Sequence, residues 1–393
     1  MKRYLFIVFF FCISFNGTQG QSLPDTVSEK AIISLLTCEE GEELYAAFGH
    51  SALRVRDSLT GIDVVFNYGT FNFREPNFYG KFVQGQLLYF LSTGSFQRFL
   101  QSYQADNRGV TEQVLNLDTL QTKELYAKLL VNLKPENKYY KYDFFYDNCT
   151  TRLWELIKPE NNEDKAEEIS PEATMSFRDY IHPYLESKPW VRFGIDILLG
   201  QPTDLATVQN TAQFLPDNLM HTLEYLEYGT KPVVKATVQL FESKPVNQEE
   251  SQFIPYVFFW GLFGGVLVLF AIEVYFNLHF HWIDRLLYLS TGLIGCLIVY
   301  LWFISDHQAT NQNLHLLWAF PVNLYFVFFP KKKTLYHIVY GLAITGLLLG
   351  FPWLPQNFPV EVIPVLLVLL LRLVRLAMSE KKKKGNIKYS MQA

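Results

Sequence analysis

Cys149 and His50 are the two residues whose types and surroundings fit thiol chemistry. Cys149 follows Asn148, a favoured helix N-cap, and apolar residues then recur at helical spacing until Pro159. The sequence therefore predicts that Cys149 lies in the first turn of a helix. There the helix dipole and the free amides would stabilise a thiolate, and the same amides could form an oxyanion hole. A histidine beside the thiol would complete an activated nucleophile.

The residues around His50 predict the element that would position it. Residues 51–68 alternate between apolar and polar side chains on either side of a polar turn, which is typical of a half-buried β-hairpin. A register that pairs Arg54 with Asp63 also pairs His50 with Asn67, so opposite charges meet and the histidine meets an amide. By this alternation His50 lies on the polar face of its strand. We expect Asn67 to hold the tautomer of the imidazole.

The chain divides into a soluble part and an apolar part near residue 252. Two bases, an apolar run and a final small residue predict a cleaved signal peptide at the N-terminus, with an uncleaved signal anchor as the alternative. Residues 21–252 carry 33 acidic and 21 basic side chains, a balance that argues against nucleic acid as a partner. We expect a signal peptide at 1–20, a catalytic core at 21–158, a helical extension at 159–252, a membrane domain at 253–378 and a basic cytoplasmic tail at 379–393.

Long apolar runs in the second part predict an all-α membrane domain of about five transmembrane helices. The runs lie at 254–275, 286–304, 314–329, 334–350 and 360–376. Lys and Arg gather in the loops and tail on one side, whereas loops 305–313 and 352–359 contain neither. The positive-inside rule then places the acidic domain outside the membrane and the C-terminus in the cytoplasm. Glu273 is expected to snorkel to the cytoplasmic surface.

Three segments carry a resemblance to a known family. They read GHSALRV at 49–55, FNYGTF at 66–71 and YDFFYDNCTTR at 142–152. In these segments the chain resembles the Lnb family, whose members resemble lipoprotein N-acyltransferases with an N-terminal periplasmic domain and a C-terminal membrane region. More distantly, a histidine that precedes an Asn-Cys motif is similar to circularly permuted papain-like enzymes, including lecithin:retinol acyltransferases and NlpC-type enzymes.

This resemblance implies an α+β permuted papain-like (NlpC-type) periplasmic domain in which the Cys149 helix packs on a sheet carrying His50. It also implies a lipoprotein N-acyltransferase. Such an enzyme moves an acyl chain from a membrane phospholipid, through a Cys149 thioester, to the N-terminal amine of a diacylglyceryl-cysteine lipoprotein. Cys149, His50 and Asn67 are the catalytic candidates, with His50 as general acid and base. The resemblance implies neither a metal nor another cofactor.

Further polar and aromatic residues are candidates for binding these substrates. Aromatic side chains at 139–146 could line an acyl groove. Ionisable residues where the second and third predicted helices reach the periplasm could hold a phosphate headgroup or the acceptor amine. The candidate substrate-binding residues are Asn148, Asp147, Tyr146, Tyr68, Arg54, Asp306, His307 and His315.

Three other functions are compatible with the same sequence. A cell-wall peptidase or amidase of NlpC type would use the same Cys-His pair, although it has little use for five helices. A phospholipase would release free fatty acid without an acceptor. A non-enzymatic membrane sensor would need neither residue, and a disulfide between Cys38 and Cys149 would favour it because a bridged thiol cannot attack.

Overall fold

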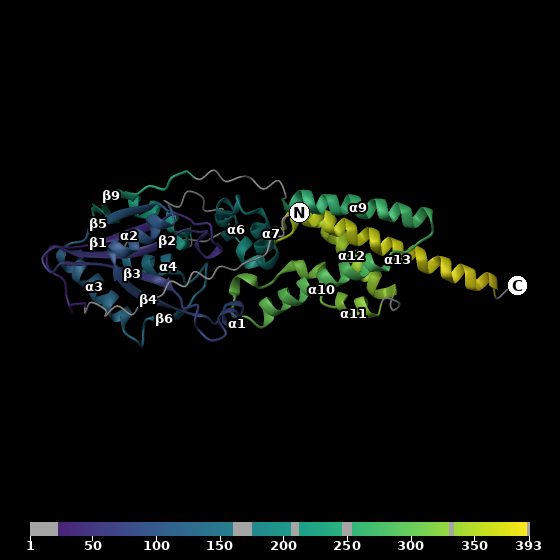
Figure 1. Cartoon of the computed structure of the whole chain (residues 1–393), viewed down its shortest axis with the longest axis horizontal. Helices are drawn as coiled ribbons and strands as arrows, with labels where there is room; N and C mark the ends of the chain where they lie inside the picture. The colour runs from purple at the N-terminus through teal and green to yellow at the C-terminus, as the bar shows by residue number, and fades with distance from the viewer. Residues whose placement is uncertain (1–22, 160–174, 206–211, 246–253, 330–333, 391–393) are drawn as a thin grey trace.

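The computed structural model describes residues 23–159, 175–205, 212–245, 254–329 and 334–390. It consists of an N-terminal domain of mixed α/β structure and a C-terminal helical domain, which lie end to end (Figure 1). The predicted signal peptide at 1–20 lies outside the described residues.

A seven-stranded antiparallel sheet forms the centre of the N-terminal domain, with the strand order β6-β4-β3-β2-β1-β5-β9. The strands are β1 Ala31–Cys38, β2 His50–Asp57, β3 Ile62–Thr70, β4 Leu88–Ser95, β5 Val110–Leu115, β6 Tyr139–Lys141 and β9 Val234–Phe241. A separate small hairpin pairs β7 Glu227–Tyr228 with β8 Lys231–Pro232. Strands β1 to β4 are neighbours in chain order and therefore form a meander.

Helices cover both faces of this sheet. They are α2 Phe96–Ala105, α3 Thr119–Leu133, α4 Cys149–Ile157 and α8 Pro216–Tyr225. Leu53 of β2 shares the large core with α3, α4 and α8, whereas its neighbour Ala52 packs on the other face with Phe96 of α2. Successive side chains of a strand point to opposite faces, so β2 contributes to both cores. The prediction that one face of this strand is polar and open is wrong, because α2 covers it.

The predicted hairpin of β2 and β3 is confirmed, but its register needs correction. The turn occupies residues 58–61. Arg54 pairs with Val65 instead of Asp63, so the ladder is displaced by two residues from the prediction. A shift of two keeps every side chain on its expected face, because the side-chain period of a strand is two. The charge pair therefore survives as a diagonal contact, with Arg54 Nε 2.7 Å from Asp63 Oδ1.

The predicted boundary at residue 158 does not separate a core from a helical extension. Between the gaps in the described residues, α6 (Phe177–Ile181), α7 (Pro189–Leu198) and α8 are helical as predicted. However, β9 pairs with β5 at the edge of the sheet, and Leu219 of α8 is fully buried in the large core. The strand signal of β9 was present but not used: Val234, Ala236, Val238 and Leu240 alternate with polar residues, although the edge strand that they form is mostly exposed.

The described part of the C-terminal domain contains α9 Pro255–Tyr275, α10 His281–Phe303, α11 Asn323–Phe328, α12 Thr334–Gly350 and α13 Val362–Ser390. Three stretches within the described residues, rather than five, are long and apolar enough to cross a membrane: Pro255–Tyr275, His281–Phe303 and Leu335–Trp353. In Figure 1, α13 lies beside α9. Because α13 continues to Ser390, the predicted tail at 379–393 begins inside a helix.

The third predicted membrane helix, at 314–329, is not a single helix. A 3-10 turn at Leu314–Leu317 is followed by a break and by α11, which has only 6 residues. Pro321 lies in the break, where its missing N–H removes a helical hydrogen bond. This prediction is therefore corrected to a turn and a short helix.

Buried charges tie three helices of the C-terminal domain together. Glu273 of α9 has no exposed surface, and Arg372 Nη1 of α13 lies 2.5 Å from its Oε2 atom. Arg372 Nε also donates to Asp284 Oδ1 of α10 at 2.7 Å, and His279 Nε2 lies 2.7 Å from the other Asp284 oxygen. The prediction that Glu273 snorkels to the surface is wrong, because a buried cation compensates its charge where it lies.

A polar junction fixes the two domains against each other. Asn313 of the C-terminal domain donates its side-chain amide to the carbonyls of Ile197 and Leu198, at 2.9 and 3.1 Å. These carbonyls belong to the end of α7, where a helix leaves its last acceptors without partners. A Cβ at Gly200 would lie 1.7 Å from the carbonyl oxygen of Asn311, so this close approach requires glycine.

Candidate active site

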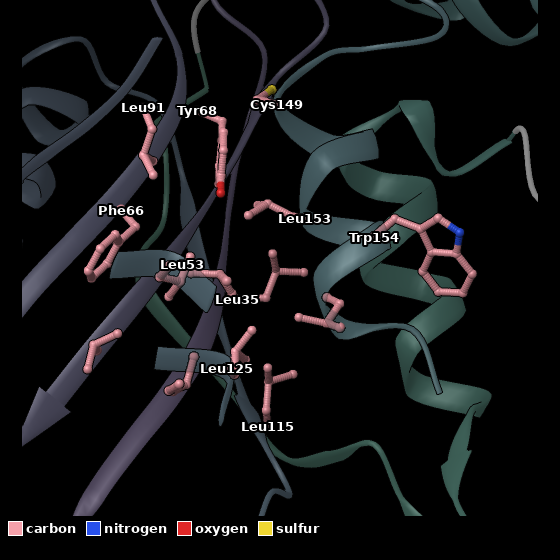
Figure 2. Packing of buried hydrophobic residues seen from close by; sticks show 14 of the residues in the cluster. Leu35, Leu53, Phe66, Tyr68, Leu91, Leu115, Leu125, Cys149, Leu153 and Trp154 are labelled. Carbon is pink, nitrogen blue, oxygen red and sulfur yellow. The ribbon is translucent and has the colours of Figure 1, made fainter. Parts of the chain in front are cut away.

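Cys149 is the first residue of α4, at the end of the helix that meets the sheet (Figure 2). Asn148 caps the helix: its Oδ1 accepts from the N–H groups of Thr150 and Thr151 at 2.7 and 2.9 Å. Leu153, one turn later, points into the core between α4 and the sheet (Figure 2). The predicted helix start and N-cap are confirmed, and apolar packing of α4 fixes where the thiol lies.

Asn148 was expected to bind substrate, but its polar atoms are already bonded within the protein. Its Nδ2 donates to the carbonyls of Phe144 and Phe214 at 2.7 and 2.8 Å, and the side chain is buried. This residue therefore joins the cap of α4 to two other segments, which makes it a positioning residue.

Replacing Asn148 with alanine should lower the free energy of unfolding by about 2–4 kcal/mol. The substitution removes the cap and leaves two carbonyls without a donor. Thermal unfolding of the detergent-solubilised protein would measure the loss. Asn148→Ser is the matched control, because its hydroxyl can still cap the helix, and we expect it to recover about 1 kcal/mol. Equal stability of Asn148→Ala and the unmodified protein would contradict this role.

His50 and Asn67 lie where β2 and β3 stop pairing. The ladder between these strands ends at Leu53 and Phe66; beyond it, β2 pairs only with β1 and β3 only with β4. In this opening His50 Nε2 lies 2.5 Å from Asn67 Oδ1. The predicted meeting of His50 and Asn67 therefore occurs, although the register that led to it is displaced. With Nε2 facing the amide oxygen, Nδ1 is the nitrogen left to face the thiol.

The Cys149 thiol and the His50 imidazole form a coupled pair. Burial opposes a thiolate, but the charge and hydrogen bond of His50, the N–H of Ser51 and the hydroxyl of Thr150 outweigh it and lower the pKa of Cys149 to about 7. Burial likewise opposes an imidazolium, but the Cys149 thiolate and the hydrogen bonds to Cys149 and Asn67 raise the pKa of His50 above its ordinary value. The pair can therefore hold a thiolate and an imidazolium at neutral pH.

Three residues around Cys149 were not singled out by the sequence reasoning. The backbone N–H of Ser51 contributes to the lowered pKa of Cys149. Gly69 has a φ of +83°, and a Cβ there would lie 3.4 Å from Cys149 Cβ, 3.8 Å from Tyr142 Cε2 and 3.9 Å from His50 Cε1. A glycine within a predicted strand is a signal of close backbone approach, so Gly69 could have been found. Tyr142 lies in the aromatic stretch at 139–146 that was expected to line an acyl groove, but no signal distinguished it from its neighbours.

Cys38 lies beside this site without joining it. It pairs with His50 across the β1–β2 ladder, but Cys38 and Cys149 are both free thiols, so the disulfide alternative is not formed. Burial raises the pKa of Cys38 to about 12. The two cysteines thus show what His50 does, since both are buried and only the one that faces the imidazole has a lowered pKa.

Three of the predicted substrate-binding residues share a cavity of about 420 Å³ that flanks α4. Tyr68, Tyr146 and Asp147 line this cavity, but Cys149 does not. The Asp147 carboxylate is held by Arg152, with an N–O distance of 2.6 Å. The cavity is therefore adjacent to the helix of the nucleophile and is not itself the place where the thiol is reached.

Arg54 lies on the α2 face of the sheet. Its guanidinium forms ion pairs with Asp63 at 2.7 Å and Glu112 at 3.2 Å, and it stacks over the ring of Phe96. Only 8 % of its side chain is exposed. These contacts account for the whole guanidinium, so the structure gives Arg54 a packing role and not the substrate contact that was predicted.

The predicted polar cluster at the end of the membrane helices is divided. Asp306 accepts from Lys141 Nζ at 2.7 Å, and His307 Nε2 lies 3.0 Å from the carbonyl oxygen of Phe82, so both residues contact the N-terminal domain. His315 is fully buried in the C-terminal domain, where its Nδ1 accepts from the Trp318 indole at 2.9 Å. Asp306 and His307 remain accessible, whereas His315 does not face the same site.

Among the described residues, His279, His281 and Asp284 place their potential metal-ligand atoms within 4.8 Å of one another. This group lies in the C-terminal domain and not beside Cys149. Both oxygens of Asp284 are already bonded, one to His279 and one to Arg372. The arrangement is thus that of a buried ion pair.

The fold and the site define a membrane protein whose α/β domain presents a cysteine and a histidine as a candidate nucleophile and base. Residues 24–181 match the family model for the Lnb N-terminal periplasmic domain, and residues 247–384 match the model for the Lnb transmembrane domain. The chain belongs to the Lnb family, as its motifs indicated. It therefore has a periplasmic N-terminal domain followed by a membrane domain. Comparison with the curated proteins and with the solved structures found no match.

Proposed function

We propose that this protein is a lipoprotein N-acyltransferase with Cys149 as its nucleophile. The observation that carries the proposal is the arrangement of Cys149, His50 and Asn67, in which an amide orients a histidine and the histidine lowers the pKa of a thiol. A helix that begins with cysteine, packed on an antiparallel sheet that supplies the histidine from an earlier strand, supports a permuted papain-like fold. Membership of the Lnb family supports the lipid substrate.

The position of the site within the domain also supports a membrane substrate. Asn148 bonds the carbonyl of Phe214, and Phe214 packs in one cluster with Ala309, which belongs to the loop after α10. A single hydrophobic cluster thus links the segment bonded to the cap of α4 with a loop at the end of a candidate membrane span. A soluble substrate would not require this placement, whereas a phospholipid and a lipoprotein both reach the enzyme from the membrane.

In the first half-reaction the Cys149 thiolate attacks the carbonyl carbon of a phospholipid ester. A carbon–sulfur bond forms, and the carbon–oxygen bond to glycerol then breaks. The leaving alkoxide takes the proton of the His50 imidazolium, so a lysophospholipid departs and a thioester remains. Asn67 holds the imidazole throughout, because its amide oxygen accepts from Nε2 while Nδ1 exchanges the proton.

In the second half-reaction the N-terminal amine of a diacylglyceryl-cysteine lipoprotein attacks the thioester. The nitrogen loses one proton to neutral His50, and the carbon–sulfur bond breaks to return the Cys149 thiolate. The product is an amide, and the thiolate and imidazolium are restored. Over the two half-reactions an ester and an amine are converted to an alcohol and an amide. Cys149 and His50 return to their starting protonation states, so no further reactant is needed.

The oxyanion of each tetrahedral intermediate needs donors close to Cys149. The N–H groups of Thr150 and Thr151 are occupied by Asn148, which reduces the set of free amides expected at this helix start. In the described parts of the chain, the backbone N–H of Cys149 itself has no acceptor. We assign it the role of an oxyanion donor, because at the N1 position it points out of the helix.

The proposed location is the bacterial inner membrane, with the C-terminus in the cytoplasm. The absence of Lys and Arg in loops 305–313 and 352–359 supports this location, because the positive-inside rule favours a periplasmic side for such loops. Five membrane passes would give the same orientation. α13 would then supply a crossing together with the three candidate spans, and the segment at 314–329 would have to supply the other despite its break.

Mass spectrometry of the intact protein tests the proposed function. The purified full chain would be incubated with defined phospholipids and compared with Cys149→Ala. We expect the unmodified protein to gain the mass of one acyl chain, in a form that hydroxylamine removes, and the variant to gain nothing. Addition of a diacylglyceryl-cysteine peptide should then discharge the thioester and yield the N-acylated peptide.

The other functions predict different outcomes of the same experiment. Release of free fatty acid without transfer to the peptide would make the protein a phospholipase. Absence of both thioester and lysophospholipid would overturn the acyltransferase proposal. Cleavage of muropeptides that depends on Cys149 would then identify a peptidase or amidase.

A further inference from the structure

An exposed apolar surface lies at the membrane end of the N-terminal domain. Tyr79, Phe82 and Val83 share one face of α1 (Phe78–Val83) at the spacing of neighbours on a helix. We define the aromatic patch as Leu44, Tyr45, Phe73, Tyr79, Phe82 and Val83. Tyr45 and Tyr79 expose 70 % and 71 % of their surface, although aromatic side chains are usually withdrawn from water. A contiguous exposed patch of this kind marks an interaction surface.

Ring contacts join the separate parts of the aromatic patch. The ring of Phe71 lies 6.2 Å from Tyr45 and 4.8 Å from Phe73, measured between centroids. Phe73 in turn lies 5.0 Å from Phe78, the first residue of α1. Segments before β2, after β3 and within α1 therefore form one surface.

Hydrogen bonds hold this surface at the level where a candidate span ends. The N–H of Asp306 donates to the carbonyl of Gln84 at 2.8 Å, and His307 Nε2 lies 3.0 Å from the carbonyl of Phe82. Phe303 is the last residue of α10, so α1 is bonded to residues that directly follow a candidate membrane span. Figure 1 shows α1 at the end of the N-terminal domain that meets α10.

A row of aromatic rings leads from the aromatic patch to the nucleophile. The ring of Phe71 lies 5.2 Å from Tyr89, and Tyr89 stacks on Tyr142 at 4.3 Å. Tyr142 and Cys149 both border Gly69, where a Cβ would lie 3.8 Å from Tyr142 Cε2 and 3.4 Å from Cys149 Cβ. The row consists of flat apolar faces, and burial raises the pKa of both of its phenols, that of Tyr89 to about 12 and that of Tyr142 well above its ordinary value, so both stay uncharged.

We propose that the aromatic patch inserts into the outer leaflet of the membrane and that the row of rings guides one phospholipid acyl chain to Cys149. Aromatic residues favour the boundary between water and hydrocarbon, and a short amphipathic helix enters it by about 5–10 Å. The occupant is lipid because α1 is bonded to the end of a membrane span. Guidance of the chain rests on the proposed acyl transfer, whereas insertion of the patch does not.

Depth-dependent fluorescence quenching tests the insertion. The full chain carrying Tyr79→Trp would be reconstituted in bilayers with phospholipids brominated near the headgroup, and the emission of the seven native tryptophans subtracted. We expect the added tryptophan to lose most of its emission. Leu59→Trp is the matched control, because Leu59 is 65 % exposed and lies in the turn at the opposite end of β2 from His50. Its emission should not change.

Acyl transfer from two donors tests the guidance. The variant Phe71→Ala should form the Cys149 thioester from bilayer phospholipid about tenfold more slowly, because it removes the first ring of the row that guides the acyl chain. Its acylation by water-soluble p-nitrophenyl acetate should match that of the unmodified protein, which shows that the thiol remains competent. Leu59→Ala should leave both rates unchanged.

Each result decides one part of the proposal. An added tryptophan at Tyr79 that is not quenched overturns the insertion. Quenching together with a normal rate from bilayer phospholipid overturns the guidance. If the unmodified protein is acylated by neither donor, the proposed acyltransferase function fails, and the quenching result still decides whether the aromatic patch enters the membrane.

Discussion

Replacing His50 with glutamine should move the midpoint of Cys149 alkylation from about pH 7 to pH 9 or above. The imidazole is the main influence that lowers the thiol pKa from its ordinary value of 9.0, and burial alone would raise it. At pH 7 the thiolate fraction should therefore fall from about one half to about one hundredth. Because a thiolate of higher pKa is a stronger nucleophile, the alkylation rate should fall by less, about five- to tenfold. Iodoacetamide labelling measured by peptide mass spectrometry separates Cys149 from Cys296.

Acyl transfer should suffer more than alkylation from the same substitution. Iodoacetamide needs only the thiolate, whereas transfer also needs a proton donor for the leaving alkoxide and an acceptor for the amine proton. We expect the rate of thioester formation to fall by about a hundredfold or more. Asn67→Ala is the comparison variant: it keeps the imidazole and removes its hydrogen-bond partner, so both effects should be smaller. An unchanged pH midpoint in His50→Gln would contradict the coupled pair.

The parts of the site that the sequence predicted depend on short-range signals. The cap at Asn148 and the helix that follows it are set by residues within one turn of each other, so the position of Cys149 could be predicted. The alternation in β2 and β3 likewise predicted the hairpin and the face of each side chain. A two-residue error in register did not separate His50 from Asn67, because a shift of two keeps each side chain on its expected face. In addition, β2 and β3 are no longer paired at that end, where the two side chains meet.

The parts that the sequence did not predict depend on contacts between distant segments. Arg54 carries no sign that Glu112, 58 residues later, will pair with it across the sheet. The helix expected at 314–329 is broken where the segment packs on α10, and a Cβ at Gly295 would lie 2.0 Å from the carbonyl oxygen of Ala319. Apolar composition predicts that this segment is buried in a membrane domain. It does not predict the backbone conformation, which tertiary packing determines.

Buried charge in the membrane domain was also outside what composition could predict. Arg372 and Arg375 were counted with the cytoplasmic bases, yet both are buried and contact Glu273. Cations that compensate buried acids contribute little to a positive surface. The proposed orientation therefore rests on Arg285, on the lysines at 331–333 and on the lysines of the predicted tail at 379–393, which the sequence still assigns to one side.

Replacing Arg372 with methionine should destabilise the membrane domain by about 3–5 kcal/mol, the usual effect of leaving a buried charge without its partner. Glu273 would keep the backbone N–H of Phe280 and the longer contact to Arg375, at 3.7 Å, and Asp284 would keep only His279 among its described partners. Thermal unfolding in detergent, together with the yield of folded protein, measures this loss. Arg285→Met is the control, because Arg285 lies on the same helix as Asp284 and is exposed.

The double variant Glu273→Met/Arg372→Met separates a lost ion pair from lost packing. It removes both charges of the closest contact and fills their space with apolar atoms, so it should recover most of the stability that Arg372→Met loses. If the double variant is as unstable as the single one, the guanidinium acts mainly through its bond to Asp284, and Asp284→Asn should then supply the rescue. If Arg372→Met is as stable as Arg285→Met, the buried ion pair does not hold α9, α10 and α13 together.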